Sequence, residues 1–400
     1  MRARGHRVTL ITNEHFAGLA AKAGLRFIPL GTEAEFERTI NNPDLWKPLA
    51  GFRLVMGTLT KLIEPLLAIL KDEYVADETV MAAQVTAFGA RIAHESLHAP
   101  LVTVHLQPSV IMSTIDPPEV PLAALMRKLP MWGRRVLLST TGRFMVDPLL
   151  APPINAARRS HGLKPVREIM HWWHSPQSVL CLFPEWFAPP QPDWPPHVHL
   201  TGFPLFDEKA QHDSDPSLEE FLNAGSSPIV FTAGSAMRHG HEFFECAVAA
   251  CEGLNRRGIL LARFNEQIPA RLPETVKHFT YVPFSELLPR AAALAHHGGI
   301  GTTAQALAAG IPQLVMPLAH DQPDNAMRLK RFGVGATLPP KHFKPDAVRD
   351  RLRALIDNPK VATRAQALAK RIREADAIDD ACRVIEAALA SRLDSAKAGV

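Results

Sequence analysis

Cysteine is scarce in this 400-residue chain, and the four that occur, Cys181, Cys246, Cys251 and Cys382, have neither CxxC nor zinc-type spacing. This pattern argues against a disulfide framework and against a zinc site, because both use cysteines at short, regular intervals. Reduced and mostly buried thiols are favoured instead. We therefore expect a cytoplasmic protein, with peripheral contact at the inner membrane face left open.

Long apolar runs and blocks of like charge are also absent. The start of the chain has no continuous apolar segment of the signal-peptide type, and the most apolar later window, 51–70, contains Arg53, Lys61 and Glu64. Neither secretion nor a membrane span is expected. The net charge of only +4 predicts no nucleic-acid partner and leaves anionic small molecules open. A content of 46% hydrophobic residues in 400 suffices for two globular domains.

Strands and helices alternate along the first half of the chain. β-branched and apolar runs predict strands at 8–12, 24–30, 79–85, 100–106, 179–183 and 198–202. Helices are expected from about residue 51, at 87–95 and within 121–160. This alternation is typical of parallel βαβ units and a doubly wound sheet.

A second series of the same kind follows a polar segment. The predicted strands are 228–232, 258–262, 276–282, 294–297 and 313–317, with helices at 242–256 and 303–309. Three parts are expected: an acceptor-binding domain at 1–206, a linker at 207–220 rich in turn formers, and a nucleotide-sugar-binding domain at 221–400. The final helices are expected to pack back on the first domain. The carboxyl ends of the strands should face the cleft between the domains.

The most informative run is HHGGIGTT, residues 296–303, where a predicted strand leads into a glycine-rich turn and a helix. Glycines allow close approach of a ligand to the backbone, and the amides and dipole at a helix N-terminus favour an anion. A histidine at this turn could donate a further hydrogen bond to a diphosphate. The alternative is a tight turn with two surface histidines.

Asp321 and Gln322 follow the next predicted strand. A carboxylate accepts hydrogen bonds and a carboxamide both accepts and donates them, so the pair suits sugar hydroxyls. Alone, it would more often cap a helix, as Asn325 also would. Because the pair follows a strand next to a predicted phosphate-binding turn, a nucleotide sugar is the simplest ligand that accounts for both features.

Several stretches together carry a family resemblance. HHGGIGT, LAAGIPQLVMPLAHDQPDNA, VFTAGS and TYVPFSELLP resemble the donor-binding domain of GT-B glycosyltransferases of family 1 and the related family 28. HSPQSVLCLFPEWFAPPQPDWP, LTGFPLFD and RGHRVTLIT resemble more narrowly the rhamnosyltransferases of rhamnolipid synthesis. The resemblance implies a GT-B fold, with two Rossmann-like parallel-sheet domains facing across a cleft. It covers nearly all of the 400 residues.

The resemblance also implies roles for individual residues. Diphosphate contacts are implied for His296, Gly298, Gly299 and Thr302, and contacts with the phosphates or the sugar for Gly234 and Ser235. The nucleotide base would pack at Tyr281 and Val282, and the sugar hydroxyls would be held by Asp321 and Gln322. No metal or other cofactor is implied, because basic groups and helix dipoles take the charge of the leaving diphosphate.

Two other features allow more than one interpretation. The run His171-Trp172-Trp173-His174 places two histidines at i and i+3, but without a third ligand an aromatic wall near the acceptor is preferred to a metal site. The helices at 121–150 carry Leu, Met, Trp and Phe with interspersed arginines. They would line a channel for a lipid acceptor, lie on a membrane surface, or simply pack on the sheet with their basic residues in water.

The resemblance implies a first strand and glycine-rich loop, carrying the general base, that would lie upstream of Met1. We expect a start codon placed too late, with true truncation as the alternative; His15 and His105, at predicted strand ends, are the substitute bases. The implied activity is inverting, metal-independent transfer of rhamnose from dTDP-rhamnose to a hydroxyl of a lipid or other small hydrophobic acceptor. The alternatives are UDP-dependent glucosylation of a sterol, macrolide, flavonoid or peptide, and a non-catalytic partner that binds nucleotide sugar.

Overall fold

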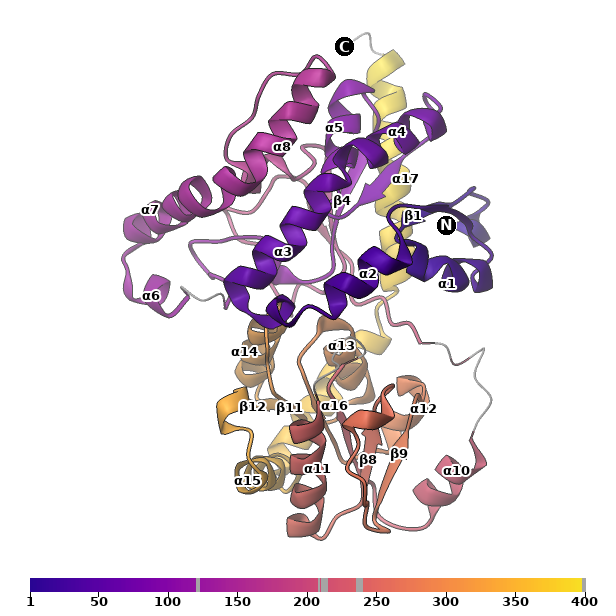
Figure 1. Ribbon diagram of the computed structural model, residues 1–400, viewed down its shortest axis with the longest axis vertical. Helices are drawn as coiled ribbons and strands as arrows, with labels where there is room; N and C mark the ends of the chain where they lie inside the picture. Colours follow the sequence, from indigo (N-terminus) through magenta and orange to yellow (C-terminus); the bar gives the residue numbers. More distant parts are fainter. Residues whose placement is uncertain (120–122, 208, 210–214, 235–239, 398–400) are drawn as a thin grey trace. The chain divides into compact units, whose positions relative to one another are not determined.

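The computed structural model describes residues 1–119, 123–207, 209, 215–234 and 240–397, in two compact units (Figure 1). The N-terminal unit holds Met1–Gly202 together with the segment that begins at Ala377, and the C-terminal unit holds Phe203–Asp376. Each unit has parallel strands and a core of its own, so the predicted α/β class with parallel sheets is confirmed. In the described part of the chain, no helix combines the length and apolar character that crossing a bilayer requires.

The N-terminal unit contains two separate parallel sheets. The smaller pairs β1 (Thr9–Thr12) with β2 (Arg26–Pro29), and the larger has the order β3-β4-β5-β6. The strands of the larger sheet are β3 (Met81–Ala83), β4 (Leu101–His105), β5 (Ser178–Cys181) and β6 (Val198–Leu200). The central strands β4 and β5 are almost wholly buried, which explains why they read as continuous apolar runs.

Helices cover the larger sheet and supply most of the N-terminal core. Their bounds are α1 (Ala17–Lys22), α2 (Glu33–Ile40), α3 (Pro48–Lys61), α4 (Ile63–Glu73), α5 (Phe88–Ser96), α6 (Ala123–Lys128), α7 (Met131–Thr141), α8 (Asp147–Ser160) and α9 (Ile169–Trp172). A short π-helical turn, η5 (Gly142–Val146), joins α7 to α8. Leu67, Ile92 and Ile154, from α4, α5 and α8, are fully buried in one cluster. The helices within 121–160 therefore anchor the unit through α8.

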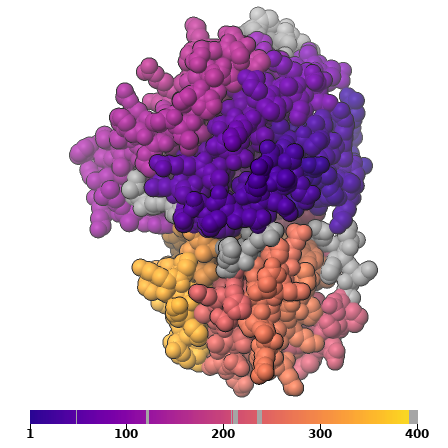
Figure 2. Space-filling view, viewed as in Figure 1, coloured from indigo at the N-terminus to yellow at the C-terminus, as the bar shows by residue number. Residues whose placement is uncertain are grey.

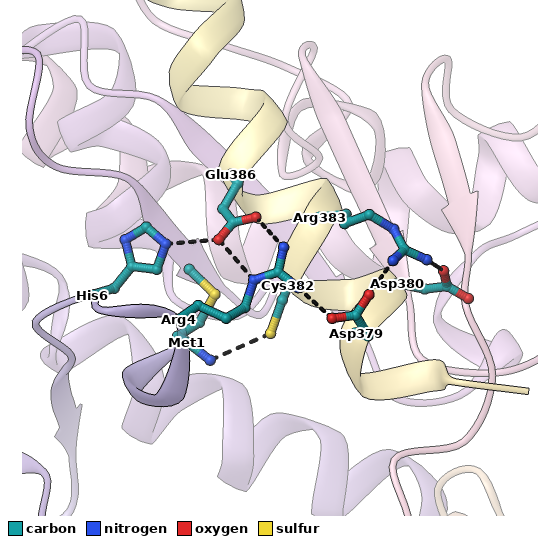
Figure 3. A network of polar contacts seen from close by, with 8 residues as sticks. All are labelled: Met1, Arg4, His6, Asp379, Asp380, Cys382, Arg383 and Glu386. Carbon is teal, nitrogen blue, oxygen red and sulfur yellow. Dashed lines mark hydrogen bonds and ion pairs between the residues drawn. The ribbon is translucent and has the colours of Figure 1, made fainter.

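The last helix, α17 (Ala377–Lys397), belongs to the N-terminal unit and packs against β4 and β5. Figure 3 shows how the start of the chain is bonded to it. Arg4 donates to Glu386 through Nε (2.9 Å) and Nη2 (2.7 Å) and also contacts Asp379, while His6 Nε2 lies 2.7 Å from Glu386. The hydrogen bond from Arg4 is the main reason why the pKa of Glu386 falls to about 2. These contacts fix α17 to the segment before β1.

The C-terminal unit has one six-stranded parallel sheet in the order β12-β11-β10-β7-β8-β9. Its strands are β7 (Ile229–Thr232), β8 (Gly258–Leu261), β9 (Val276–Phe279), β10 (Ala293–His296), β11 (Gln313–Val315) and β12 (Gly335–Thr337). Its helices are α10 (Pro216–Asn223), α11 (His241–Leu254), α12 (Phe284–Leu287), α13 (Ile300–Ala309), α14 (Gln322–Phe332), α15 (Pro345–Ile356) and α16 (Pro359–Arg373). The four strands β7, β8, β10 and β11 are buried throughout.

Part of the segment predicted as a linker, 207–220, is helical. Residues 216–220 form the start of α10, where the Asp215 side chain accepts a hydrogen bond from the Ser217 amide and Pro216 occupies the first turn. This is a standard helix start, and Leu218 then packs into the C-terminal core. The helix start at Asp215 and Pro216 was not predicted, because many turn-forming residues precede it.

Candidate functional site

Three central strands of the C-terminal unit, β7, β10 and β11, lie side by side, so their carboxyl ends meet at one edge of the sheet. β10 is paired with β7 on one side and β11 on the other, with His296 in register with Thr232 and Val315. The chain passes from β7 to β8 but reaches β10 from β9, so the strand order reverses between β7 and β10. In doubly wound sheets, ligands bind outside the strand ends at such a reversal. The described residues that follow β7, β10 and β11 therefore form the candidate site.

The turn after β10 depends on two glycines. Gly298 has a φ of +96°, and a β-carbon there would lie 2.6 Å from Cγ1 of Val315. Gly299 occupies the N-cap of α13 and offers no side chain to cap the helix. Because the amides of the first helical turn have no acceptor within the helix, those of Gly301 and Thr302 point out of its N-terminus. Together with the helix dipole, these donors suit an anion.

His296 acts inside this turn and does not present a donor to a ligand. Its side chain is fully buried, Nε2 lies 2.9 Å from Oε1 of Gln313, and Nδ1 accepts from the Gly298 amide at 3.1 Å. Burial lowers its pKa to about 3, so the imidazole is neutral. The predicted diphosphate contact is therefore corrected here: the first histidine of the pair shapes the turn, because both of its ring nitrogens are already hydrogen-bonded.

The second histidine, His297, lies between the two glycine turns. A β-carbon at Gly299 would come within 2.5 Å of its Nε2, and one at Gly234, where φ is +95°, within 2.8 Å of its Cε1. Burial lowers the pKa of His297 to about 4, and its Nδ1 is buried without a partner among the described residues. A neutral imidazole carries one N–H donor. The sequence analysis did not single out His297. The signal that could have revealed it is the presence of Gly234 and Gly299, since a side chain at either position would collide with its ring.

Asp321 joins the loop after β11 to the N-terminus of α13. Its Oδ2 accepts from the Ile300 amide at 3.2 Å and from Nδ2 of Asn325 at 2.7 Å, and the same Nδ2 donates to the carbonyl of Gly298 at 2.9 Å. Burial raises the pKa of Asp321. Both of these contacts use Oδ2, which leaves Oδ1 as an acceptor for a ligand. Asn325 therefore does more than cap a helix, because its side chain connects Asp321 to the Gly298 carbonyl.

Gln322 and Thr302 differ in what they offer. Gln322 is buried, and its Oε1 accepts from the amides of Leu318 at 2.7 Å and Ala319 at 3.2 Å, so the side chain fixes the loop after β11. Thr302 lies half-buried in the first turn of α13, beside the amides described above. The structure therefore gives Gln322 a positioning role whether or not it also contacts a ligand.

The residues expected to pack against a nucleotide base lie farther along the sheet. Tyr281 and Val282 follow β9, which β8 separates from β7. Val282 is buried in the C-terminal core, whereas Tyr281 is 43% exposed. Of the pair, only Tyr281 offers a surface to a ligand. Ser235 lies outside the described residues.

The two histidines considered as substitute bases lie in the N-terminal unit in different surroundings. His15 follows β1 in a short 3-10 turn; its ring stacks on Phe36 at 4.2 Å, and its Nδ1 lies 3.4 Å from Oε1 of Glu33. His105, the last residue of β4, is buried next to His174, with ring centroids 5.1 Å apart and no acidic partner among the described residues. His15 is the more suitable base of the two, because a carboxylate lies within reach of its Nδ1 and can orient the ring.

The two tryptophans of the run 171–174 pack into the N-terminal core, Trp173 as a buried residue and Trp172 partly buried against it, so the predicted aromatic wall is corrected. The Trp172 ring centroid lies 5.3 Å from the Arg91 guanidinium and 5.2 Å from that of Arg158, and its Nε1 donates to Glu95 at 2.7 Å. Trp173 is buried. The described residues contain no group of three or more His, Cys, Asp or Glu side chains arranged to hold a metal ion.

A family model and curated relatives agree on one kind of activity. Residues 259–382 match the model described as "Erythromycin biosynthesis protein CIII-like, C-terminal domain". The chain is 29% identical to O-mycaminosyltylonolide 6-deoxyallosyltransferase of Streptomyces fradiae, over 96% of this chain and 92% of that protein. It is 27% identical to sterol 3-beta-glucosyltransferase UGT80A2 of Arabidopsis thaliana, over 99% of this chain and 62% of that protein.

Solved structures settle the fold. The glycotransferase of kitacinnamycin superposes with a TM-score of 0.74 at 21% identity, covering 97% of this chain and 93% of that one. The chain is a glycosyltransferase of the GT-B fold. A further solved structure, spinosyn rhamnosyltransferase SpnG complexed with thymidine diphosphate, matches this glycosyltransferase with a TM-score of 0.65 at 18% identity, over 94% of this chain and 90% of that one.

Proposed function

We propose that this glycosyltransferase moves a hexosyl group from a nucleoside-diphosphate sugar to a hydroxyl group of a hydrophobic acceptor, without a metal and with inversion. The C-terminal unit is the donor domain and the N-terminal unit the acceptor domain. The observation that carries the proposal is the N-terminus of α13 at the reversal of strand order, with His297 between Gly234 and Gly299. An amide-rich corner of this kind, beside a buried imidazole, suits a leaving diphosphate.

The diphosphate would be held by the amides of Gly299, Gly301 and Thr302 and by an N–H of His297. These donors are in place before the reaction, so they stabilise the charge that develops as the bond between sugar and diphosphate breaks. His296 and Gln322 position the turns through the internal bonds described above. Oδ1 of Asp321 would accept from a sugar hydroxyl, and Tyr281 would cover the nucleotide base.

For the donor, we propose a 6-deoxyhexose on thymidine diphosphate, with dTDP-rhamnose as the specific candidate. Two observations support this choice: one relative is named a 6-deoxyallosyltransferase, and the rhamnosyltransferase of similar fold was solved with thymidine diphosphate. For the acceptor, we propose a lipid hydroxy acid or a macrolide-like aglycone. The resemblance to the rhamnosyltransferases of rhamnolipid synthesis supports the first, and the macrolide-type relatives support the second.

A second candidate is transfer of glucose from UDP-glucose to a sterol. It rests on the similarity to sterol 3-beta-glucosyltransferase, which extends over 99% of this chain. Both candidates use the same donor domain and the same chemistry. They differ only in the sugar, the nucleotide base and the acceptor.

The test is a matrix of two donors and three acceptors. The purified chain is incubated with one of two donors, dTDP-rhamnose or UDP-glucose. Each donor is combined with one of three acceptors: a hydroxyalkanoyloxy-alkanoic acid, a macrolide aglycone or a sterol. The products are identified by mass spectrometry. Rhamnosylated product from dTDP-rhamnose supports the first proposal, and glucosylated sterol supports the second. Absence of product and of nucleoside diphosphate release with both donors would contradict both proposals.

A further inference from the structure

One face of the N-terminal unit exposes an unusual number of large apolar side chains. They lie on α6, α7 and η5. Figure 1 labels α6 and α7, and Figure 2 shows the surface of this part of the sequence in purple to magenta. Trp132 is 72% exposed, Phe144 69% and Val136 58%. The full set is Leu125, Met131, Trp132, Val136, Phe144 and Met145. Single exposed apolar residues are ordinary, but six within 21 residues, Leu125 to Met145, form a patch that calls for a partner.

Trp132, Val136 and Phe144, the three most exposed of these residues, lie on the continuous helical segment formed by α7 and η5. Trp132 and Val136 are four positions apart, and Phe144 follows eight positions later. Positions spaced by four along a helix share a face. Gly133 and Val146 are the buried residues of α7 and η5, whereas these three large side chains face solvent. We call these three residues, with Leu125, Met131 and Met145, the α6–α7 face.

The charge on this face has a single sign. Residues 123–146 contain five basic residues and no Asp or Glu: Arg127, Lys128, Arg134, Arg135 and Arg143. Two of the five are used within the protein. Arg127 contacts Glu119, and Arg134 donates to the carbonyls of Leu129 at 3.0 Å and Thr114 at 2.9 Å.

The other three cations, Lys128, Arg135 and Arg143, are exposed. They form no ion pair with any residue that the structure describes. Arg143 lies 5.8 Å from the Phe144 ring, so a cation and an exposed aromatic ring are adjacent on this face. Apolar side chains are thus interspersed with cations that have no anion beside them.

We propose that the α6–α7 face docks on an anionic lipid surface. Trp and Phe side chains partition into the boundary between headgroups and acyl chains, while Lys and Arg extend their charges to the phosphates. Exposed basic residues without acidic neighbours are attracted to anionic lipid. A second copy of the protein fits this face less well, because it would bring Lys128, Arg135 and Arg143 against their own copies.

Docking would also bring the enzyme to its acceptor, a consequence that rests on the proposed function. A hydrophobic acceptor partitions into the bilayer, so an enzyme held at the lipid surface meets it at a higher local concentration. The docking itself requires only the α6–α7 face.

The experiment measures cosedimentation of the full chain with vesicles of phosphatidylcholine and phosphatidylglycerol, beside vesicles of phosphatidylcholine alone. The first variant combines Trp132→Ser with Phe144→Ser, and the second combines Lys128→Gln, Arg135→Gln and Arg143→Gln. Their matched controls are Leu49→Ser with Ile378→Ser, both more than half exposed, and Arg271→Gln with Lys341→Gln and Lys360→Gln, all exposed.

We expect the wild type to bind the anionic vesicles, to release with added salt, and to bind phosphatidylcholine at least tenfold more weakly. Each test variant should lose about tenfold or more of the binding, and neither control should. Equal binding by wild type and test variants, or no binding by the wild type, would overturn the proposal. So would a wild-type dimer in solution that Trp132→Ser with Phe144→Ser dissociates. Affinity for dTDP, measured on the same samples, tests the proposed function separately.

Discussion

The Nε2 atom of His297 lies so close to Gly299 that a β-carbon at position 299 would come within 2.5 Å of it. The backbone of Gly299 has an ordinary φ of −61°, which alanine can adopt. What opposes alanine at this position is the steric clash with the His297 imidazole. The ring must therefore move if residue 299 gains a side chain. This relationship links the N-terminus of α13 to the histidine that would donate to a diphosphate.

The first prediction concerns Gly299→Ala. Displacing the imidazole removes a hydrogen bond to a charged group, which is worth about 1.5–3 kcal/mol, so affinity for dTDP should fall about tenfold or more. The measurement is calorimetric titration with dTDP. Gly57→Ala in α3, where a β-carbon meets nothing within 4 Å, is the control and should bind as the wild type does. Full dTDP affinity in Gly299→Ala would remove His297 from the diphosphate site.

The second prediction concerns Asp321→Ala. If Oδ1 accepts from the sugar, the variant should lose about tenfold or more in affinity for dTDP-rhamnose and much less in affinity for dTDP. This difference separates sugar binding from general damage to the α13 turn, which would weaken both ligands alike. Asp346→Ala, a surface carboxylate with 85% of its side chain exposed, should change neither affinity. Equal losses for both ligands would make Asp321 a positioning residue only.

The third prediction concerns acid sensitivity of the N-terminal unit. Burial, followed by the charge on His174, lowers the pKa of His105 to about 3, against about 6.5 in an unfolded chain. The unfolded state therefore binds the proton first, and stability is lost as pH falls below about 6.5. Between pH 7 and pH 5 this one residue should contribute about 2 kcal/mol to the loss.

Denaturant unfolding followed by tryptophan fluorescence at the two pH values checks this prediction. His105→Phe should be less sensitive to acid than the wild type, whereas the exposed His199→Gln should keep the wild-type difference. A wild-type pH dependence in His105→Phe would show that His105 takes up no extra proton on unfolding.

The fourth prediction concerns the buried ion pairs around Trp172. Glu95 lies 2.7 Å from both Arg91 Nη1 and Arg158 Nη2, and the two arginine side chains are only 10% and 5% exposed. Glu95→Gln leaves two buried cations without their anion and should destabilise the N-terminal unit by about 3–5 kcal/mol. The matched surface variant is Glu73→Gln, whose partner Arg26 has 60% of its side chain exposed; it should cost about 1 kcal/mol or less. Similar melting temperatures for the two variants would contradict this account.

Much of the architecture could be predicted from the sequence, because alternating apolar strands and amphipathic helices have distinct periodicities. The start of α10 at Pro216 was missed because polar turn formers surround a genuine helix N-cap. The roles of His296 and His297 could not be separated, since adjacent side chains point in different directions and only the folded structure decides which ring is hydrogen-bonded within the turn. Likewise, the sequence suggested that Trp172 contacts a ligand, because its contacts with Arg91 and Arg158 are made between segments far apart in the chain.

The most direct test of the central claim is a titration of dTDP into the wild-type chain and into His297→Ala at neutral pH, where the imidazole is neutral. The account predicts that the wild type binds one dTDP per chain and that His297→Ala binds it about tenfold or more weakly, with an unchanged melting temperature in the absence of ligand. Equal dTDP affinity in the two proteins, or no binding by the wild type, would contradict the account.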